Sequence, residues 1–441
     1  MGDLEGYRGQ SLTALEAAGV SIGDFLSLEV DGQSVMGTLA PRYAHDDDSH
    51  IVIKLKSGYN VGLSVAKVTK VSRLAKGERP SFTSSNPKTR GDLLEVAILG
   101  TGGTIASRVE YRTGAVQPAI SSEDLYSLIP ELSDIARIRT EVILTVASED
   151  LEPEHWGKMA EKVAERVAEG ARGVVVTTGT DVMGYTSAAL AFALQGVPVP
   201  VFVVGSQRSS DRPSSDAYLN LIGAVTLAVA AEFAGVYLVM HADSSDELLA
   251  IHRATRVRKN HASARDAFES IGIPPEGYWT RKGPELISKS LPPRARAEKF
   301  VPKPLFDPNV ALVKFYPSMP TSLLEAQLAS GLKGLIIEGT GLGHVNRKNI
   351  AVIQRFIAGG GLAFMTSQCI WGRVDLNVYA NGRDLLQAGV VPLEDMLAET
   401  ALVKLMWTIS NTASAKEAEG LMRKNLAGEV TERSFPSGQT A

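Results

Sequence analysis

Three separated groups of side chains in this sequence could do chemistry together. Thr104 follows the run Gly100–Gly103, Thr180 precedes Asp181, and Lys259 lies in a basic run further along the chain. A threonine hydroxyl is a weak nucleophile until a neighbouring group takes its proton, so a lysine and a carboxylate could supply a proton relay. The combination is compatible with a hydrolase that uses a threonine nucleophile.

Each group also has an ordinary structural interpretation. Glycines after a strand often form only a turn, a threonine beside an aspartate often caps a helix, and a basic run is usually a solvated face. Lysine becomes useful in catalysis when burial or nearby cations lower its pKa, and Arg256 and Arg258 precede Lys259 closely. The hypothesis therefore depends on whether the fold brings the groups together.

The elements around these groups are predicted to be alternating strands and helices. Short apolar runs at 95–99, 173–177 and 199–204 are typical of buried parallel strands. Open α/β sheets bind their ligands beyond the carboxyl ends of such strands. Thr104 and Thr180 each follow a strand end, so they could face each other across a cleft.

The pattern along the chain predicts an α/β fold of several parts. Alternation and the turn signal Asp31-Gly32 indicate a small antiparallel β-barrel first, and a segment rich in Pro and Ser follows as a linker. A polar tail that frays is expected last. The expected parts are the barrel at 1–75, the linker at 76–92, an α/β domain with the active site at 93–285, an interdomain connection at 286–309, a second α/β domain at 310–410 and the tail at 411–441.

Composition excludes several classes of protein. The 441 residues carry a net charge of −4, which gives no sign of a general nucleic-acid binder. The single cysteine, Cys369, excludes an internal disulfide and is predicted to be a buried thiol at a strand end. The first residues lack the pattern of a signal peptide, so we expect a cytoplasmic protein. The apolar segment 219–233 contains Asn220 and Glu232 and indicates a buried helix, not a membrane span.

Taken together, the motifs resemble the bacterial-type L-asparaginase family. They are Thr-Gly-Gly-Thr-Ile-Ala at 101–106, Thr-Gly-Thr-Asp at 178–181, and Lys259 followed by Arg-Asp-Ala-Phe at 265–268. Within that family, the N-terminal barrel and segments 205–216 and 339–345 resemble the D subunits of archaeal glutamyl-tRNA(Gln) amidotransferases. The resemblance implies a small β-barrel followed by a two-domain, asparaginase-like doubly wound parallel sheet.

The resemblance also implies roles for individual residues. Thr104 would be the primary nucleophile and Thr180 the second catalytic threonine. Asp181 and Lys259 would complete the proton relay. Tyr111 would lie on a mobile flap and help to activate the first threonine.

Further residues would bind the substrate. Ser148 and Glu149 would hold its α-carboxylate and α-amino groups, and backbone amides around Gly103 and Gly179 would stabilise the oxyanion. Two positions depart from the family pattern, since Thr178 stands where histidine is usual and Val182 where threonine is frequent. These departures affect substrate fit more than the choice of nucleophile.

The implied activity is hydrolysis of glutamine to glutamate and ammonia. The ammonia would pass to a partner, the E subunit of the amidotransferase, which uses ATP and Mg to convert Glu-tRNA(Gln) to Gln-tRNA(Gln). The resemblance implies a heterotetramer built on a homodimer of this chain, with tRNA held mainly by the partner. Neither a cofactor nor a metal is expected in this chain.

Several alternatives remain open. A free-standing L-asparaginase would lack the N-terminal barrel, and a dinucleotide-binding module would need a small residue where Ile105 stands. A catalytically inert scaffold would show no amide hydrolysis. Cys369 could be a nucleophile, although its neighbours match neither the papain nor the class I glutaminase signature. His45 and His50 enclose three aspartates, which suggests either a metal site or, more simply, a solvated loop.

Overall fold

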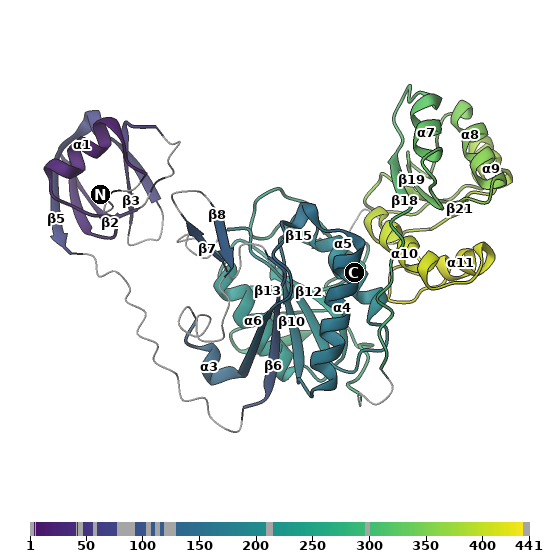
Figure 1. Cartoon of the computed structure of the whole chain (residues 1–441), viewed down its shortest axis with the longest axis horizontal. Helices are drawn as coiled ribbons and strands as arrows, with labels where there is room; N and C mark the ends of the chain where they lie inside the picture. The colour runs from purple at the N-terminus through teal and green to yellow at the C-terminus, as the bar shows by residue number, and fades with distance from the viewer. Residues whose placement is uncertain are drawn as a thin grey trace.

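Three folded parts follow one another along the chain (Figure 1). The computed structural model describes residues 4, 6–40, 42, 47–55, 60–76, 93–102, 107–110, 115–118, 129–208, 215–295 and 300–434. An N-terminal sheet is followed by a large α/β part and then by a smaller one.

The N-terminal part is a five-stranded antiparallel sheet with one helix, α1 (Gly9–Ala17). Asp31 and Gly32 join the first two strands with φ of 51° and 78°, the backbone that the hairpin signal predicts. Leu15 of the helix is fully buried with Leu26 of the sheet in a separate small core. The strands, in the spatial order β4-β3-β2-β1-β5, are β1 (Phe25–Val30), β2 (Gln33–Leu39), β3 (His50–Lys54), β4 (Asn60–Ser64) and β5 (Val68–Ala75), with a 3-10 turn, η1 (Val65–Lys67), before β5.

The large α/β part is built on an eight-stranded sheet in the order β17-β16-β13-β12-β11-β10-β6-β9. Five strands are parallel, namely β6 (Glu95–Gly100), β9 (Arg137–Val142), β10 (Gly173–Thr177), β11 (Pro200–Val204) and β12 (Gly235–His241). The sheet differs from the wholly parallel one expected, because β13 (Leu248–Arg253), β16 (Gly277–Thr280) and β17 (Gly283–Leu286) add antiparallel strands at one edge.

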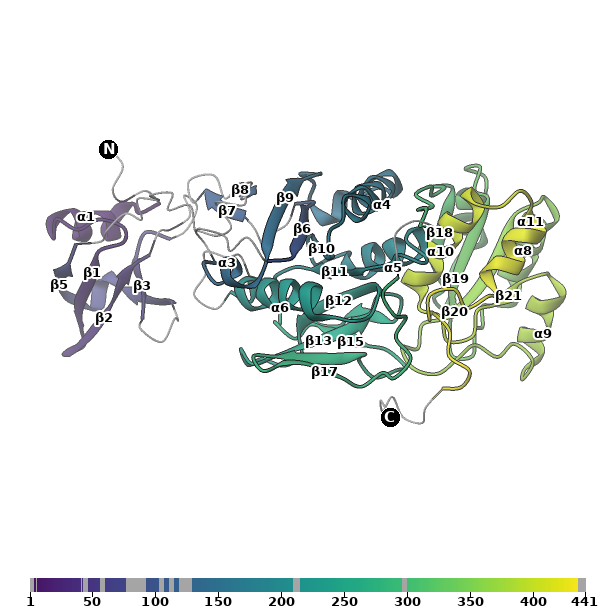
Figure 2. The same cartoon turned by 90° about the horizontal axis from the view of Figure 1, so that it is seen from below.

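Helices cover both faces of this sheet, so its strands are apolar on both sides (Figure 2). On one face, α4 (Pro153–Ala168) and α5 (Met183–Ala193) pack against residues such as Leu99. On the other, α3 (Leu132–Ile135) and α6 (Ala217–Ala230) pack against the alternate residues, such as Ile98. The mixed α/β fold predicted from the apolar runs is confirmed.

The second α/β part has a four-stranded parallel sheet whose core continues into the first. Phe192 of α5 stacks on Trp407 of α10, with ring centroids 6.0 Å apart, inside one hydrophobic cluster that also contains Ile336 and Phe364. The strands are β18 (Val310–Lys314), β19 (Gly334–Gly339), β20 (Leu362–Ser367) and β21 (Val391–Pro392), and the helices are α7 (Thr321–Leu328), α8 (Arg347–Ala358), α9 (Ala380–Gln387) and α10 (Ala398–Ser410).

The segment after Asn411 is not the fraying polar tail that composition predicts. Up to residue 434, where the described part of the chain ends, it forms α11 (Ala415–Met422) and then a run of bends in which Glu429 is fully buried. The Glu429 carboxylate lies 2.6 Å from Nζ of Lys404, which is also fully buried. The prediction is wrong because each buried charge in this segment has a partner, and pairing offsets the cost of burial.

None of the helices in the described part of the chain combines the length and the hydropathy of a membrane-spanning segment. The same residues contain no group of three or more His, Cys, Asp or Glu side chains arranged to hold a metal ion. His45 lies outside the described residues, and Nδ1 of His50, the first residue of β3, lies 2.9 Å from Oδ1 of Asp47 in an exposed contact.

His252 of β13 is a buried side chain that should limit stability in acid. Its Nδ1 lies 2.8 Å from Ser270 Oγ, and its Nε2 has no hydrogen-bond partner in the described part of the chain. Burial lowers the pKa of His252 from 6.5 to about 3, so the folded state keeps the ring neutral where the unfolded chain binds a proton. The free energy of unfolding should therefore fall as the pH drops from about 6.5 towards 3, by roughly 1.4 kcal/mol per pH unit for this group.

Urea unfolding at several pH values between 7 and 4.5 measures this effect. His252→Gln removes the titrating ring, so we expect the variant to lose less stability per pH unit than the unmodified protein, whatever its stability at pH 7. Equal slopes for the two proteins would contradict the prediction.

Candidate functional site

The two glycine-bearing strand ends lie side by side. β6 and β10 are parallel neighbours in register, with Gly100 opposite Thr177. The backbone amide and the hydroxyl of Thr101 both donate to the Thr177 carbonyl at 3.0 Å. Thr101 therefore ties the two loops together. Gly102 has a φ of +107°, and a Cβ there would lie 2.4 Å from the Val146 carbonyl oxygen, so the turn requires glycine.

Thr180, Asp181 and Lys259 meet at this carboxyl edge. Lys259 Nζ lies 2.9 Å from Thr180 Oγ1 and 2.8 Å from Asp181 Oδ1. The lysine side chain is 13% exposed, whereas that of Asp181 is 67% exposed. One amine thus contacts a hydroxyl and a carboxylate at once, and this geometry can pass a proton between them.

The structural alternatives for these residues do not hold. The N-cap of α5 is Val182, and no side chain caps the helix there, so Thr180 and Asp181 do not serve as its cap. The basic run is not a solvated face, since Arg256 is 1% exposed and Lys259 is mostly buried. The polar groups of both segments are instead directed into contacts within the protein.

A short hairpin positions Lys259. It consists of β14 (Val257–Lys259) and β15 (Phe268–Ser270), with Lys259 opposite Phe268. Phe268 and Ala267 are buried in the main hydrophobic core, and the Asn260 amide donates to the Ala267 carbonyl at 2.7 Å. The hairpin thereby holds the lysine backbone against the core while the amine reaches Thr180.

Ser148 and Glu149 lie beside the same loop. They belong to the 3-10 turn η2 (Ser148–Asp150), which follows β9. Ser148 is buried, and its hydroxyl donates to Glu149 Oε2 at 3.3 Å. A Cβ on Gly179 would lie 2.7 Å from the Ser148 Cβ, so the backbone before Thr180 runs directly against this serine.

Gly179→Ala should therefore damage the site. The added methyl must push Ser148 away or shift the loop that carries Thr180, because 2.7 Å is shorter than a carbon–carbon contact allows. We expect kcat/KM for the amide substrate to fall by about 100-fold, as a displacement near 1 Å does in other enzymes. Steady-state ammonia release measures it. Gly420→Ala in α11, where a Cβ meets nothing, is the control and should leave kcat/KM unchanged.

Three of the predicted site residues, Gly103, Thr104 and Tyr111, lie outside the described residues. Gly102 leads into the first two, and β7 (Ser107–Glu110) pairs antiparallel with β8 (Ala115–Pro118) on either side of 111–114 in the sequence. The catalytic roles of all the predicted site residues stay predictions.

A buried polar chain behind the site was not predicted from the sequence. The fully buried carboxylate of Asp216 accepts from the Gln207 and Arg208 amides at 3.0 Å, and Asn220 bridges it to the Gly205 carbonyl at 3.0 Å. This chain supports the loop after β11. A Cβ on Gly205 would lie 2.9 Å from the Thr180 methyl, so the supported loop borders Thr180.

The polar chain continues to the loop that follows β12. His241 Nδ1 lies 2.7 Å from Asn220 Oδ1, and Asp246 links His241 to Arg265. Burial lowers the pKa of His241, which favours a neutral ring. The sequence contains a clue to this polar chain, because Asp216, Asn220 and Arg265 all lie in or next to predicted motifs. Which residues pair with one another, however, depends on the fold.

The two departures from the family pattern and the cysteine can also be placed. Thr178 is buried, and its amide donates to the Val204 carbonyl at 3.0 Å. Val182 immediately precedes α5.

Cys369 is exposed beyond the end of β20, so the prediction of a buried thiol is wrong. The turn after β20 turns the thiol outward, which the apolar run before it does not reveal.

Three family models match successive parts of the chain. The model described as "GatD N-terminal domain" matches residues 20–74, "Asparaginase, N-terminal" matches 95–291, and "Glutaminase/Asparaginase C-terminal domain" matches 309–422.

Curated proteins match over almost the full length. The chain is 47% identical over 432 residues to the glutamyl-tRNA(Gln) amidotransferase D subunit of Metallosphaera sedula, covering 98% of this chain and 97% of that protein. It is 44% identical over 430 residues to the protein of the same name from Pyrococcus furiosus, covering 96% and 98%. Among solved structures, the thermostable L-asparaginase from Thermococcus kodakarensis matches with a TM-score of 0.67 at 33% identity, covering 77% of this chain and 99% of that one.

Proposed function

From the premise that this chain belongs to the family of glutamyl-tRNA(Gln) amidotransferase D subunits, we infer that it is the glutaminase component of a tRNA-dependent amidotransferase and that Thr104 is its nucleophile. The observation that supports this catalytic centre is the contact of Lys259 Nζ with Thr180 Oγ1 and Asp181 Oδ1. It lies beside the loop that leads to Thr104.

In the proposed reaction, the Thr104 oxygen attacks the side-chain carbonyl carbon of glutamine. The bond to nitrogen breaks, the nitrogen takes a proton and leaves as ammonia, and a glutamyl ester remains on Thr104. Water then hydrolyses the ester and releases glutamate. Lys259 and Thr180 relay the protons, Tyr111 assists the attack, and the amides around Gly103 and Gly179 stabilise the oxyanion.

The remaining side chains of the site bind the amino-acid end of glutamine. Glu149 has the charge to pair with the α-ammonium group, and the Ser148 hydroxyl can donate to the α-carboxylate. Gly179 runs against Ser148, so the loop that carries Thr180 lies directly against the turn that carries the binding residues.

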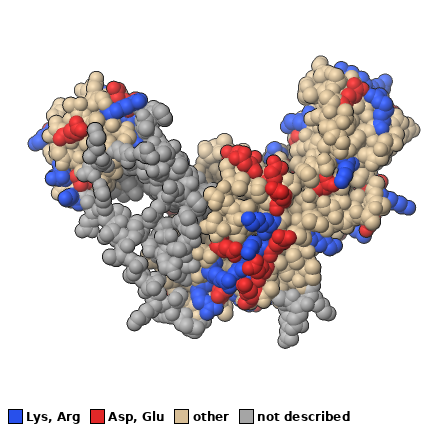
Figure 3. Space-filling view, viewed as in Figure 1, with Lys and Arg blue, Asp and Glu red and all other residues tan. Residues whose placement is uncertain are grey.

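The ammonia then serves a partner, the E subunit of the amidotransferase, which uses ATP and Mg to amidate Glu-tRNA(Gln). We propose that this partner makes most of the contacts with tRNA. We also propose that the assembly is a heterotetramer that contains a homodimer of this chain. On the face shown in Figure 3, Lys and Arg side chains are interspersed with Asp and Glu over the large α/β part, without a continuous basic surface.

A free-standing L-asparaginase is the second candidate, because the structural neighbour from Thermococcus kodakarensis is named for that activity. That neighbour accounts for 77% of this chain, whereas the N-terminal part at 20–74 matches the "GatD N-terminal domain" model. The N-terminal part therefore favours the amidotransferase role.

An ammonia-release assay tests the proposal. The chain is given glutamine or asparagine, with and without the E subunit and Glu-tRNA(Gln). We expect glutamine to be the better substrate and its hydrolysis to rise when partner and tRNA are both present. Faster hydrolysis of asparagine, with no response to partner or tRNA, would instead support the asparaginase.

A further inference from the structure

The segment that follows α11 returns to the large α/β part beside the Lys259 hairpin. We call residues 423–434 the C-terminal strap. Its Ala427 carbonyl accepts from the Thr255 hydroxyl at 3.0 Å, and Leu426, Ala427 and Val430 pack against the main core. Gly428 has a φ of +78°, and a Cβ there would lie 2.3 Å from an Arg253 nitrogen, so the strap lies tightly on the strand before the hairpin.

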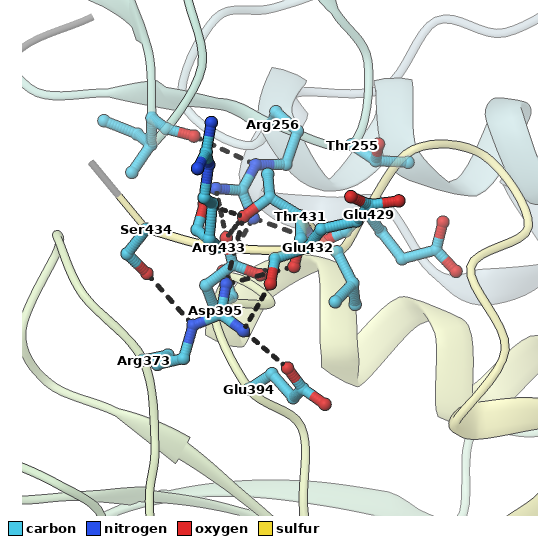
Figure 4. A network of polar contacts seen from close by, with 12 residues as sticks. Thr255, Arg256, Arg373, Glu394, Asp395, Glu429, Thr431, Glu432, Arg433 and Ser434 are labelled. Carbon is cyan, nitrogen blue, oxygen red and sulfur yellow. Dashed lines mark hydrogen bonds and ion pairs between the residues drawn. The ribbon is translucent and has the colours of Figure 1, made fainter.

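Arg256 is the point where the strap, the smaller α/β part and the hairpin meet (Figure 4). Its guanidinium is 1% exposed and donates to the Ile271 carbonyl at 2.9 Å and to the Asp395 carbonyl at 2.7 Å. It also contacts the Asp395 carboxylate at 3.2 Å and the Glu429 carbonyl at 3.2 Å. Because the guanidinium is planar and its partners are fixed, these contacts hold the Arg256 side chain in one orientation.

The strap holds Asp395 in turn. The Thr431 amide donates to Asp395 Oδ1 at 3.0 Å, and its hydroxyl donates to Oδ2. Arg373 from the smaller α/β part donates to the Thr431 carbonyl at 3.0 Å and also contacts Ser434 and Glu394 (Figure 4). Arg373 therefore holds the backbone of Thr431, and Thr431 in turn orients the Asp395 carboxylate that contacts Arg256.

Arg256 also closes the base of the hairpin. The Ile271 amide donates to the Arg256 carbonyl at 2.7 Å, and the Arg256 side chain donates back to the Ile271 carbonyl. Arg256 immediately precedes β14 and Ile271 immediately follows β15, so both strands are fixed at one end. Lys259 is the last residue of β14, about 10 Å along an extended strand.

We propose that the C-terminal strap is a positioning element for Lys259. Thr431 and Asp395 fix Arg256, Arg256 fixes the base of the hairpin, and the hairpin places Lys259 Nζ against Thr180 Oγ1. This inference rests on the proposed function, because its kinetic test reads the reaction assigned to Lys259. The contacts of Thr431 and Arg256 are with other protein groups, so we propose that they act through the hairpin.

Two truncated chains and two point variants test the proposal. A chain ending at Val430 keeps Glu429 with Lys404 but lacks Thr431, and a chain ending at Ser434 keeps the whole strap. Thr431→Val removes the hydroxyl with little change of shape, and Thr431→Ser retains it. We expect the Val430 chain and Thr431→Val to lose at least about tenfold in kcat for glutamine with KM changed less than about twofold. The Ser434 chain and Thr431→Ser should match the full chain.

Hydrogen exchange of the peptide 257–271, followed by mass spectrometry, gives a readout independent of activity. Thr431→Val should speed exchange there, because the base of the hairpin opens more often. Thr226→Val in α6, which removes a hydroxyl that bonds the Ile222 carbonyl, is the matched control for a general loss of stability. It should leave both kcat and the exchange of this peptide unchanged.

An unchanged kcat in Thr431→Val would overturn the proposal. The proposal would also be overturned if Thr431→Val had a lower kcat but its peptide 257–271 exchanged no faster than the same peptide in Thr226→Val. If the Val430 chain does not fold, the point variants still decide the question. Failure of the proposed function looks different, since Lys259→Met would then hydrolyse glutamine as fast as the unmodified chain.

Discussion

Replacing Lys259 with methionine is expected to lower kcat for glutamine hydrolysis by about 1,000-fold, within the range of a lost acid–base group. Methionine fills a similar volume but has no amine, so Thr180 Oγ1 and Asp181 Oδ1 lose the group that contacts both at 2.9 and 2.8 Å. KM should change little, because the lysine is not among the residues assigned to bind the α-groups of glutamine. Ammonia release under saturating glutamine measures the effect.

Two further substitutions show what the lysine contributes. Lys259→Arg keeps the positive charge but cannot release its proton at neutral pH, so it should be almost as inactive as Lys259→Met. Lys289→Met changes an exposed lysine and should leave kcat unchanged. High activity in Lys259→Arg would mean that charge alone matters, and high activity in Lys259→Met would remove Lys259 from the mechanism.

Thr104→Ala should abolish ammonia release, with a loss on the order of 10⁴-fold or more, as for other covalent nucleophiles. Without the hydroxyl no glutamyl ester can form, so mass spectrometry of acid-quenched enzyme should find the adduct in the unmodified chain and not in the variant. A variant that still forms the adduct would place the nucleophile elsewhere.

Thr101→Val is the matched control on the same loop. The Thr101 hydroxyl donates to the Thr177 carbonyl at 3.0 Å, so its loss should reduce the free energy of unfolding by about 1 kcal/mol. We expect less than a tenfold loss of kcat, since the backbone amide still bonds the same carbonyl. An inactive Thr101→Val would mean that the hydroxyl contributes directly to catalysis.

The parallel strands β6, β10 and β11 could be predicted because their pattern is local, whereas the equally parallel β9 carries alternating polar residues and was not predicted. Each residue of 173–177 is buried, so an apolar run between glycine and polar residues was sufficient to place β10. The antiparallel strands β13, β16 and β17 were not predicted. β13 carries polar residues such as His252, β16 and β17 have only four residues each, and their pairing is determined by neighbours across the sheet.

The candidate site could be predicted in part for a similar reason. Thr180, Asp181 and Lys259 stand in compact motifs, and the structure brings them within hydrogen-bonding distance. Arg256 also lies in a predicted motif, but its partner Asp395 is 139 residues away. Asp and Glu are rarely buried unless paired, so composition alone places Glu429 in a solvated tail.

On the proposal that the strap positions Lys259, the enzyme becomes fully active only after the end of the chain has been synthesised. The contact between Arg256 and the Glu429 carbonyl joins residues 173 apart, and closing so long a loop is entropically costly and slow. Thr180, in the loop after β10, and Lys259, in β14, leave the ribosome well before the strap does. A nascent chain, or one cut short before residue 423, would thus have its catalytic side chains without the support that aligns them, and free glutamine would be protected from unfinished protein.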